Sequence, residues 1–226
     1  YRVRGTKEPF YTLNIICGSM EARQLKAAAK KHGVTITEYM NAVLIYALVE
    51  NQKNAKTWKE RPVRIAMPVN LRQFFPSNTL RNFITMVYPG VDPRMGDYSF
   101  EEILRQVHYY MRYYINDKFL RADITTNAQT FRSPFIRIVP LWFKDITVKQ
   151  FYKRVQDCQS SAGLTNLGVI KVPKEMEPYV ERFDILMGQP FSPRTNCAIV
   201  TYKDIATIGF ASSIIENDIE RIFFRK

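Results

Sequence analysis

The chain has 226 residues, of which 46% are hydrophobic and 24% are charged. This composition is ordinary for a globular protein and excludes a disordered or fibrous chain, and no apolar run reaches the ~20 residues that a membrane-spanning helix needs. The formal net charge of +12 attracts anions such as nucleic acid, acidic membranes or phosphorylated small molecules. The basic residues are scattered, and no RNA-binding motif or zinc finger accompanies them, which argues against nucleic acid as the partner.

The three cysteines, Cys17, Cys158 and Cys197, are widely spaced and include no CxxC pair. Such sparse use indicates a reducing compartment and offers neither a disulfide framework nor a zinc site. Because each cysteine lies among apolar neighbours, all three are predicted to be buried thiols in a cytoplasmic protein. The first residues, Tyr-Arg-Val-Arg-Gly, contain no initiator Met and no signal-peptide pattern, so the chain is expected to be part of a longer protein.

The first part of the chain predicts a strand followed by two helices. Residues 10–17 (FYTLNIIC) are β-branched and aromatic and predict the strand, after which Ser19 is expected to cap a helix that ends at Gly33. Thr35 and Glu38 have the spacing of a capping box. The helix that they begin is apolar almost all round, so it is predicted to be deeply buried.

The middle of the chain predicts two strands and a long helix. The strands cover residues 62–69 and 81–88, and a loop separates them. Ser99 and Glu102 form a second capping box, which begins a helix with apolar residues at helical spacing as far as Tyr114. A further apolar helical stretch is bracketed by prolines. These are Pro134 and Pro140.

The last third of the chain is rich in strands. Four segments have strand composition: 164–172, 179–187, 196–202 and 206–210. Lys203 and Asp204 form a connection short enough for a hairpin, and a final helix is predicted from about Ile215. The pattern predicts one α+β domain over residues 1–226, with a mixed β-sheet covered by helices on one side.

A catalytic centre is hard to find among these residues. The two histidines, His32 and His108, each lie in a predicted helix without an acidic residue four positions later, so structural roles are favoured for both. No GxSxG, P-loop, GxGxxG or HExxH motif is present. Because histidine is so rare, no metal site is expected.

Polar residues at the ends of apolar strands are the remaining candidates for a site. Asn70 and Arg72 end one strand, Asn82 enters the next, and Thr165 and Asn166 lie where a core strand would prefer valine. Buried polar groups cost free energy unless they are paired. These side chains therefore either hold loops in place or face a binding site. For each residue alone the structural role is favoured, because Asn and Arg at strand ends commonly bond neighbouring carbonyls, whereas the set together suggests a site.

The motifs around these residues resemble the acyl-CoA-dependent acyltransferase superfamily. This superfamily includes chloramphenicol acetyltransferase, the condensation domains of peptide synthetases, and the BAHD and wax-ester-synthase acyltransferases, and the greatest similarity is to bacterial alcohol acetyltransferases. The resemblance covers nearly the whole chain. Its motifs are PVNLR (68–72), FPSNTLRNF (75–83), TNLG (165–168) and FDILMGQP (183–190), the last matching the BAHD segment DFGWGKP only at Asp184, Gly188 and Pro190.

The resemblance implies that the chain is the C-terminal half of a two-half enzyme with the chloramphenicol-acetyltransferase-like fold. In such enzymes the general-base histidine belongs to an HHxxxDG motif in the first half. This chain lacks the motif, so it is expected to contain no catalytic base and to need its N-terminal half as a partner. Asn70, Arg72 and Asn82 would line the substrate tunnel, and Thr165 and Asn166 would be donors to the tunnel or to the oxyanion.

The reaction implied by the resemblance is transfer of an acyl group from acyl-CoA, or from a carrier-bound thioester, to an alcohol or amine. A coenzyme A thioester would be a co-substrate, and no tightly bound cofactor is expected. The surface that meets the missing half should form an apolar patch through which the chain could dimerise. The alternative is a non-catalytic, condensation-like scaffold or binding module.

Overall fold

The computed structural model describes residues 1–55, 59–132, 138, 140–151, 159–188 and 195–226. A seven-stranded mixed sheet organises the chain, in the order β1-β7-β6-β5-β2-β3, with β4 paired to β2. The pairs β2–β5 and β5–β6 are parallel, and the other pairs are antiparallel. The strands are β1 Asn14–Glu21, β2 Val63–Asn70, β3 Ile84–Val87, β4 Gly90–Val91, β5 Ala162–Val169, β6 Thr195–Tyr202 and β7 Ile205–Ser212.

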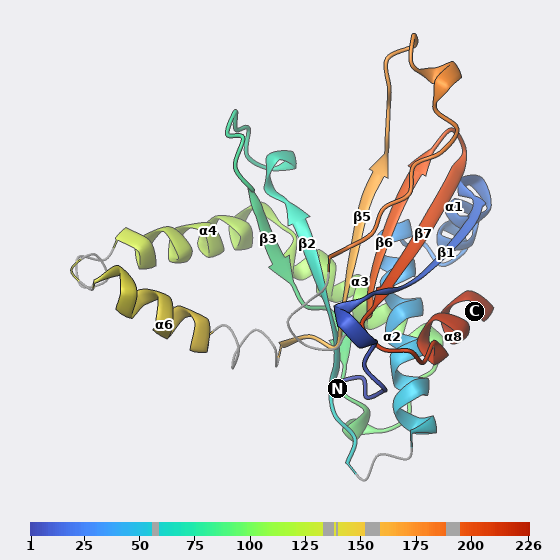
Figure 1. Cartoon of the computed structure of the whole chain (residues 1–226), viewed down its shortest axis with the longest axis horizontal. Helices are drawn as coiled ribbons and strands as arrows, with labels where there is room; N and C mark the ends of the chain where they lie inside the picture. Colours follow the sequence, from blue (N-terminus) through green and yellow to red (C-terminus); the bar gives the residue numbers. More distant parts are fainter. Residues whose placement is uncertain (56–58, 133–137, 139, 152–158, 189–194) are drawn as a thin grey trace.

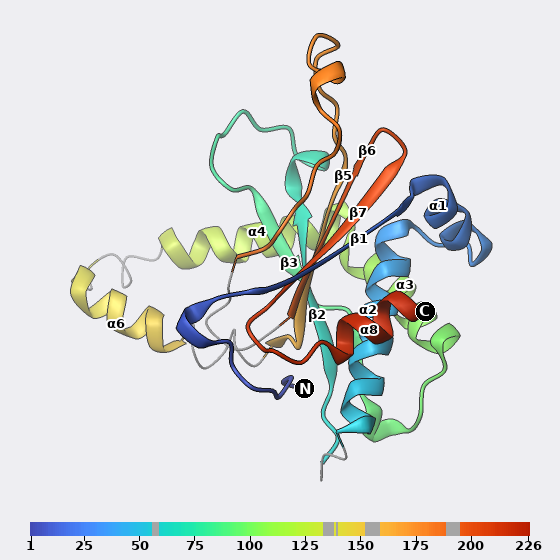
Figure 2. The ribbon, with the colours of Figure 1, turned by 45° about the vertical axis from the view of Figure 1, so that its right-hand side comes forward.

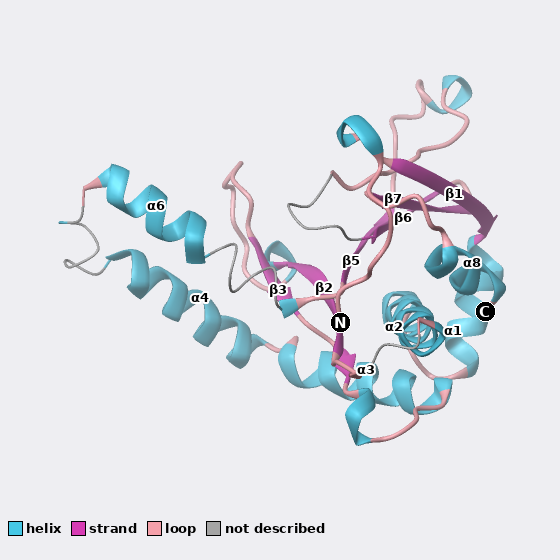
Figure 3. Ribbon diagram, turned by 60° about the horizontal axis from the view of Figure 1, so that its bottom comes forward, coloured by secondary structure: helices cyan, strands magenta, loops and turns pink. Residues whose placement is uncertain are grey.

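Four helices gather on one side of the sheet, as the sequence predicts, and two others form a separate arm (Figures 1 and 2). The four are α1 Ala22–Lys31, α2 Ile36–Asn54, α3 Phe100–Tyr114 and α8 Asp218–Arg225. The arm consists of α4 Asp117–Arg132 and α6 Leu141–Phe151, and it extends away from β3 (Figure 3). None of the described helices is long and apolar enough to cross a membrane.

The hydrophobic core lies between the sheet and α2, which is buried along most of its length. Burial alternates along β2, so Ile65 and Met67 face the helices while Arg64 lies on the open face. Both capping boxes form as predicted, with Thr35 and Ser99 as the N-caps of α2 and α3. Each satisfies two exposed backbone N–H groups at a helix start.

The strand predicted at residues 179–187 is wrong. Residues 177–179 form a short 3₁₀ helix, and the chain from 180 to 188 has no regular structure. It crosses the open face of β6 and β7 instead: the Phe183 ring packs edge-to-face on Tyr202, and Asn196 Nδ2 donates to the Gly188 carbonyl at 3.4 Å. A segment that packs across a sheet needs apolar residues just as a strand within the sheet does. Composition alone therefore cannot distinguish a covering segment from a strand.

The first strand begins and ends four residues later than predicted. Pairing with β7 continues as far as Glu21, opposite Ile205, so Ser19 lies inside the strand and Glu21 takes the N-cap position of α1. Here tertiary pairing overrides the local capping signal. Cys17 is exposed on β1 and is not the buried thiol predicted.

Other expectations of the sequence have mixed outcomes. Cys197 is buried as predicted, and Cys158 lies outside the described residues, as do parts of the stretch around Pro134. The hairpin between β6 and β7 turns at Lys203 and Asp204, whose positive φ angles of 50° and 60° suit a tight turn with the twist of the strands. The last helix begins at Asp218, so Ile215 lies before it and is half exposed.

A buried carboxyl group lies beneath α8. Glu220 is 2% exposed, and neither of its oxygens makes a well-directed hydrogen bond among the described residues. Burial raises the pKa of this carboxyl, and burial followed by the nearby Glu220 charge raises the pKa of the Cys197 thiol. The cluster therefore favours protons on both groups.

Replacement of Glu220 by glutamine should stabilise the fold at high pH. Because the carboxyl pKa is raised in the folded state, its contribution to stability is complete below the unfolded value of 4.5 and is lost as the pH rises through the folded value. We expect Glu220→Gln to unfold at a higher urea concentration than the wild type at pH 8, with a smaller difference at pH 5. An equal difference at both pH values would contradict a raised pKa.

Gly209 provides a test of the crossing segment. A Cβ atom at this position would lie 2.4 Å from the Ile185 carbonyl oxygen, whereas a Cβ at Gly188 would meet nothing within 4 Å. Gly209→Ala should therefore destabilise the protein by roughly 1–3 kcal/mol through overpacking, measured by urea unfolding. Gly188→Ala is the matched control and should change the unfolding midpoint little.

Candidate functional site

The sheet divides between β2 and β5. These two strands pair only at Ile65 with Ala162 and at Ala66 with Gly163, and they then diverge toward their C-terminal ends (Figure 1). The predicted site residues lie on the two sides of this division. Asn70 ends β2 on one side, and Thr165 and Asn166 lie on β5 on the other.

Thr165 and Asn166 point to opposite faces of β5, because successive side chains of a strand alternate. Asn166 faces the helices, where its Nδ2 donates to Thr37 Oγ1 at 3.0 Å and its Oδ1 accepts from the Gly168 amide at 2.9 Å. Thr165 faces the open side and is partly buried. Its hydroxyl makes no hydrogen bond within the described residues, so it is the available donor of the two.

Arg72 fastens the loop that joins β2 to β3. One of its Nη atoms donates to the carbonyl oxygens of Thr79 at 2.8 Å and Arg81 at 2.7 Å, and its amide donates to Asn70 Oδ1 at 3.1 Å. Asn82 is exposed and makes no hydrogen bond within the described part of the chain. Of these three residues, Asn70 and Arg72 are therefore occupied in shaping the loop.

A cluster of polar side chains lies among α2, α3 and β2, on the side of the sheet that the helices cover. Asn41 is fully buried and donates to Met67 Sδ at 3.3 Å and to the Thr37 carbonyl at 2.8 Å. His108 Nδ1 lies 3.3 Å from Glu38 Oε1, and its Nε2 accepts from Arg112 at 3.0 Å. Sequence spacing on one helix could not find this acidic partner, because Glu38 lies on α2 and His108 on α3.

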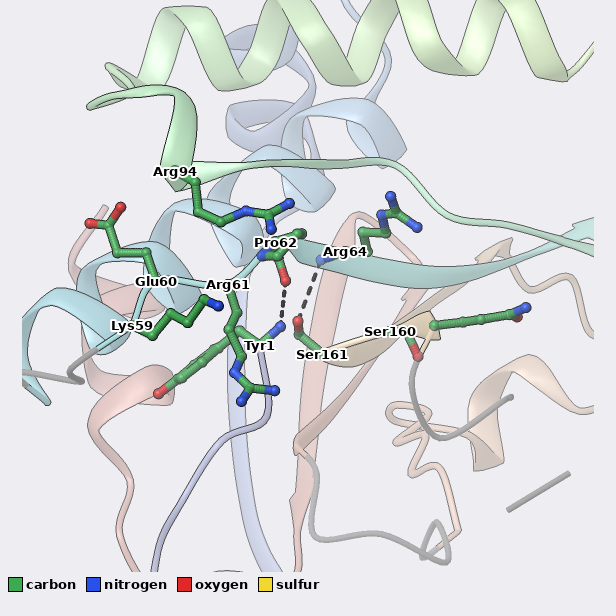
Figure 4. Close-up of a pocket in the computed structure, with 10 residues that line it drawn as sticks. Tyr1, Lys59, Glu60, Arg61, Pro62, Arg64, Arg94, Ser160 and Ser161 are labelled. Atoms are coloured by element: carbon green, nitrogen blue, oxygen red, sulfur yellow. Dashed lines mark hydrogen bonds between the residues drawn. The ribbon is translucent and has the colours of Figure 1, made fainter. Parts of the chain in front are cut away.

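A basic cleft lies at the other end of β2, where β2 and β5 begin (Figure 4). Its volume is about 410 Å³. The residues lining the cleft are Tyr1, Lys59, Glu60, Arg61, Pro62, Arg64, Arg94, Gln159, Ser160 and Ser161. They come from segments that are distant in sequence, at residues 1, 59–64, 94 and 159–161, so no single local motif predicted this site.

Large apolar side chains are exposed on both sides of the division in the sheet. Ile84 and Met86 lie on β3, and Leu167 and Val169 lie on β5. Within the described residues, no group of three or more His, Cys, Asp or Glu side chains could hold a metal ion. The open part of the sheet is thus an apolar surface with a few hydroxyl and amide groups.

Solved structures with the same fold include an acetyltransferase and an epimerization domain. The trichothecene 15-O-acetyltransferase TRI3 from Fusarium sporotrichioides has 15% identity and a TM-score of 0.61, with 99% of this chain covering 48% of that one. The epimerization domain of tyrocidine synthetase B has 12% identity and a TM-score of 0.53, with coverage of 99% and 49%. The fold is therefore the chloramphenicol-acetyltransferase-like fold, and the chain spans about half the length of these two proteins.

The chain belongs to the alcohol acetyltransferase family, whose sequence pattern it matches over residues 5–192. The wax ester synthase/diacylglycerol acyltransferase from Marinobacter aquaeolei has 12% identity and a TM-score of 0.50, and the chain covers 51% of it. No curated protein sequence matches this chain. The resemblance found in the motifs is confirmed for the family and for the fold.

Loss of the Arg72 side chain should loosen the β2–β3 loop. Arg72→Ala removes two charge-assisted hydrogen bonds from the loop carbonyls. We expect faster amide hydrogen exchange and faster proteolysis within residues 73–83, with little change in the exchange of α2. Arg105→Ala, which removes an exposed arginine from α3, is the control. Equal amide hydrogen exchange in Arg72→Ala and Arg105→Ala would contradict the role of Arg72 in holding the loop.

Proposed function

We propose that the chain is one half of an acyltransferase that moves an acyl group from a thioester to an alcohol. The observation that carries the proposal is the match to the alcohol acetyltransferase family over residues 5–192. The position of Thr165 supports it. Its partly buried hydroxyl has no partner among the described residues and lies where β5 leaves β2.

In the proposed mechanism, the catalytic base comes from outside this chain, which contains no HHxxxDG motif. The base takes the proton of the acceptor hydroxyl, and the resulting oxygen attacks the thioester carbonyl. The Thr165 hydroxyl donates a hydrogen bond to the oxyanion of the tetrahedral intermediate, where such a donor is most effective. Collapse of the intermediate breaks the carbon–sulfur bond and forms the ester, and the base returns its proton to the leaving thiolate, which departs as the thiol of the donor.

The other polar residues hold this geometry in place. Asn166 ties β5 to Thr37 at the start of α2, so it is a positioning residue, and Arg72 keeps the neighbouring loop closed. Asn70 and Asn82 are proposed to line the path of the acceptor. A coenzyme A thioester suits the net charge of +12, because coenzyme A is a polyanion.

The proposed partner is the half that contains the base. The exposed side chains of Ile84, Met86, Leu167 and Val169 provide an apolar surface of the kind that a partner covers. In the absence of that half, the same surface could pair two copies of the chain. Dye binding to exposed apolar surface, together with the mass in solution, measures both properties.

An acyl-transfer assay tests the proposed function. The protein is the present chain joined to the half that precedes it, and release of coenzyme A from acetyl-CoA is followed with a thiol reagent over a panel of alcohols. Thr165→Val should lower kcat by about 10²- to 10³-fold through loss of the oxyanion donor, whereas Thr165→Ser retains the hydroxyl and most of the activity. The chain alone should release no coenzyme A.

One result would contradict the proposed function, and another would contradict only the role of Thr165. Absence of alcohol-dependent release by the joined protein would favour the non-catalytic binding module. Equal kcat values for Thr165→Val and the wild type would leave the transferase reaction in place and remove Thr165 from the mechanism.

A further inference from the structure

The basic cleft is separate from the proposed acyl-transfer site. It lies where β2 begins, beside Arg64, whereas Asn70 ends the same strand. Six residues of extended chain, at ~3.3 Å each, place these two positions about 20 Å apart. The cleft therefore needs an explanation of its own.

Positive charge dominates the cleft. Four cationic side chains line it, from Lys59, Arg61, Arg64 and Arg94. The neighbouring carboxylates are Glu60 in the lining and Asp92, which is paired with Arg94, so the cleft keeps an excess of positive charge. The Glu60 carboxylate points away from the arginines in Figure 4. Arg61 and Arg64 form no ion pair within the described residues. Like charges at this density repel one another, so an anion bound among them would relieve an unfavourable interaction.

The guanidinium group of Arg94 is held in a fixed orientation. Its Nε and Nη2 atoms donate to the two carboxylate oxygens of Asp92 at 2.8 and 2.5 Å. The group keeps further N–H donors, because a guanidinium has five of them. Its side chain extends toward Pro62 and Arg64 in Figure 4. A pre-oriented arginine loses less conformational entropy when it binds a ligand.

Ser161 adds a buried neutral donor. Its side chain is 1% exposed, and its Oγ accepts a hydrogen bond from the Arg64 amide at 3.4 Å. The hydroxyl proton is engaged by no acceptor within the described residues, so it can be donated to a ligand. The cleft thus presents guanidinium, ammonium and hydroxyl donors together, which complement the acceptor-only oxygens of a phosphoryl group.

We infer that this cleft binds a phosphate-bearing small molecule. Its volume of about 410 Å³ lies within the range of small-molecule sites and exceeds what one phosphate group fills. The phosphoryl group would lie between Arg61, Arg64 and Ser161, with Arg94 at the opposite wall. Coenzyme A and other phosphorylated metabolites all carry phosphoryl groups that could bind in this way. The experiment below distinguishes coenzyme A from the other metabolites.

Binding has a structural consequence that can be measured. Arg61 and Arg64 belong to the β2 side of the sheet and Ser161 to the β5 side. A phosphoryl group held by both sides would cross-link them at the place where they pair. The occupied protein should therefore unfold at a higher temperature and show slower amide exchange at residues 161–163.

Calorimetric titration of the chain with inorganic pyrophosphate tests the inference. The wild type should bind, and Arg64→Gln and Arg61→Gln should each weaken binding by about tenfold or more, as expected for loss of a charge-assisted hydrogen bond. Lys31→Gln removes the same charge from the exposed end of α1 and should leave the affinity within about twofold. Arg61→Lys, which keeps the charge, should recover part of the loss.

The outcomes separate this site from the proposed transferase function, because the titration needs no acyl donor and no second half. Competition by coenzyme A would identify its phosphates as the natural source. Pyrophosphate binding without such competition would indicate another phosphorylated metabolite. The inference is wrong if the wild type gives no binding heat, or if Lys31→Gln weakens binding as much as Arg64→Gln, since attraction would then follow net charge alone.

Discussion

The continuity of the sheet depends on a short parallel contact between β2 and β5. Two residue pairs join the strands, and the Ser161 amide adds a bond of 2.7 Å to the Arg64 carbonyl. On one side lie β3 and β4, and on the other lie β6, β7 and β1. Helix α2 packs beneath and buries apolar side chains from both sides. Because the strands part beyond this contact, the polar ends of β2 and β5 become accessible.

Local signals predicted those elements whose boundaries are set within a few residues. Both capping boxes, the long apolar helix and the Lys203–Asp204 hairpin follow from such signals. Prediction was wrong where distant residues decide the structure. Pairing with β7 moved the first strand past Ser19, and residues 180–188 cover the sheet instead of joining it. Helix α4 was not predicted, and its buried Leu120 is its main contribution to the interior.

The functional site could be predicted only in part, because distant residues also determine its geometry. Motif resemblance found Thr165 and Asn166, and their adjacent positions on a strand place them on opposite faces. Only the structure shows that Asn166 is already bonded to Thr37. The role of Arg72 could not be predicted from the sequence, because the carbonyl groups that it binds belong to residues seven and nine positions later. The basic cleft joins residues near positions 60, 94 and 160. The net positive charge of the sequence predicted attraction for anions, but it could not show where in the fold a basic site would lie.

The arrangement of the edge strand has a consequence for how the chain folds. β1 pairs along its whole length with β7, from Asn14 opposite Ser212 to Glu21 opposite Ile205. Thr6 is likewise bonded to Glu216. During synthesis, the first strand must wait for almost the entire chain before it finds its partner. Contacts of such long range slow folding and leave apolar strand edges open to aggregation, so production of the chain should benefit from chaperones that cover these edges until β7 has been made.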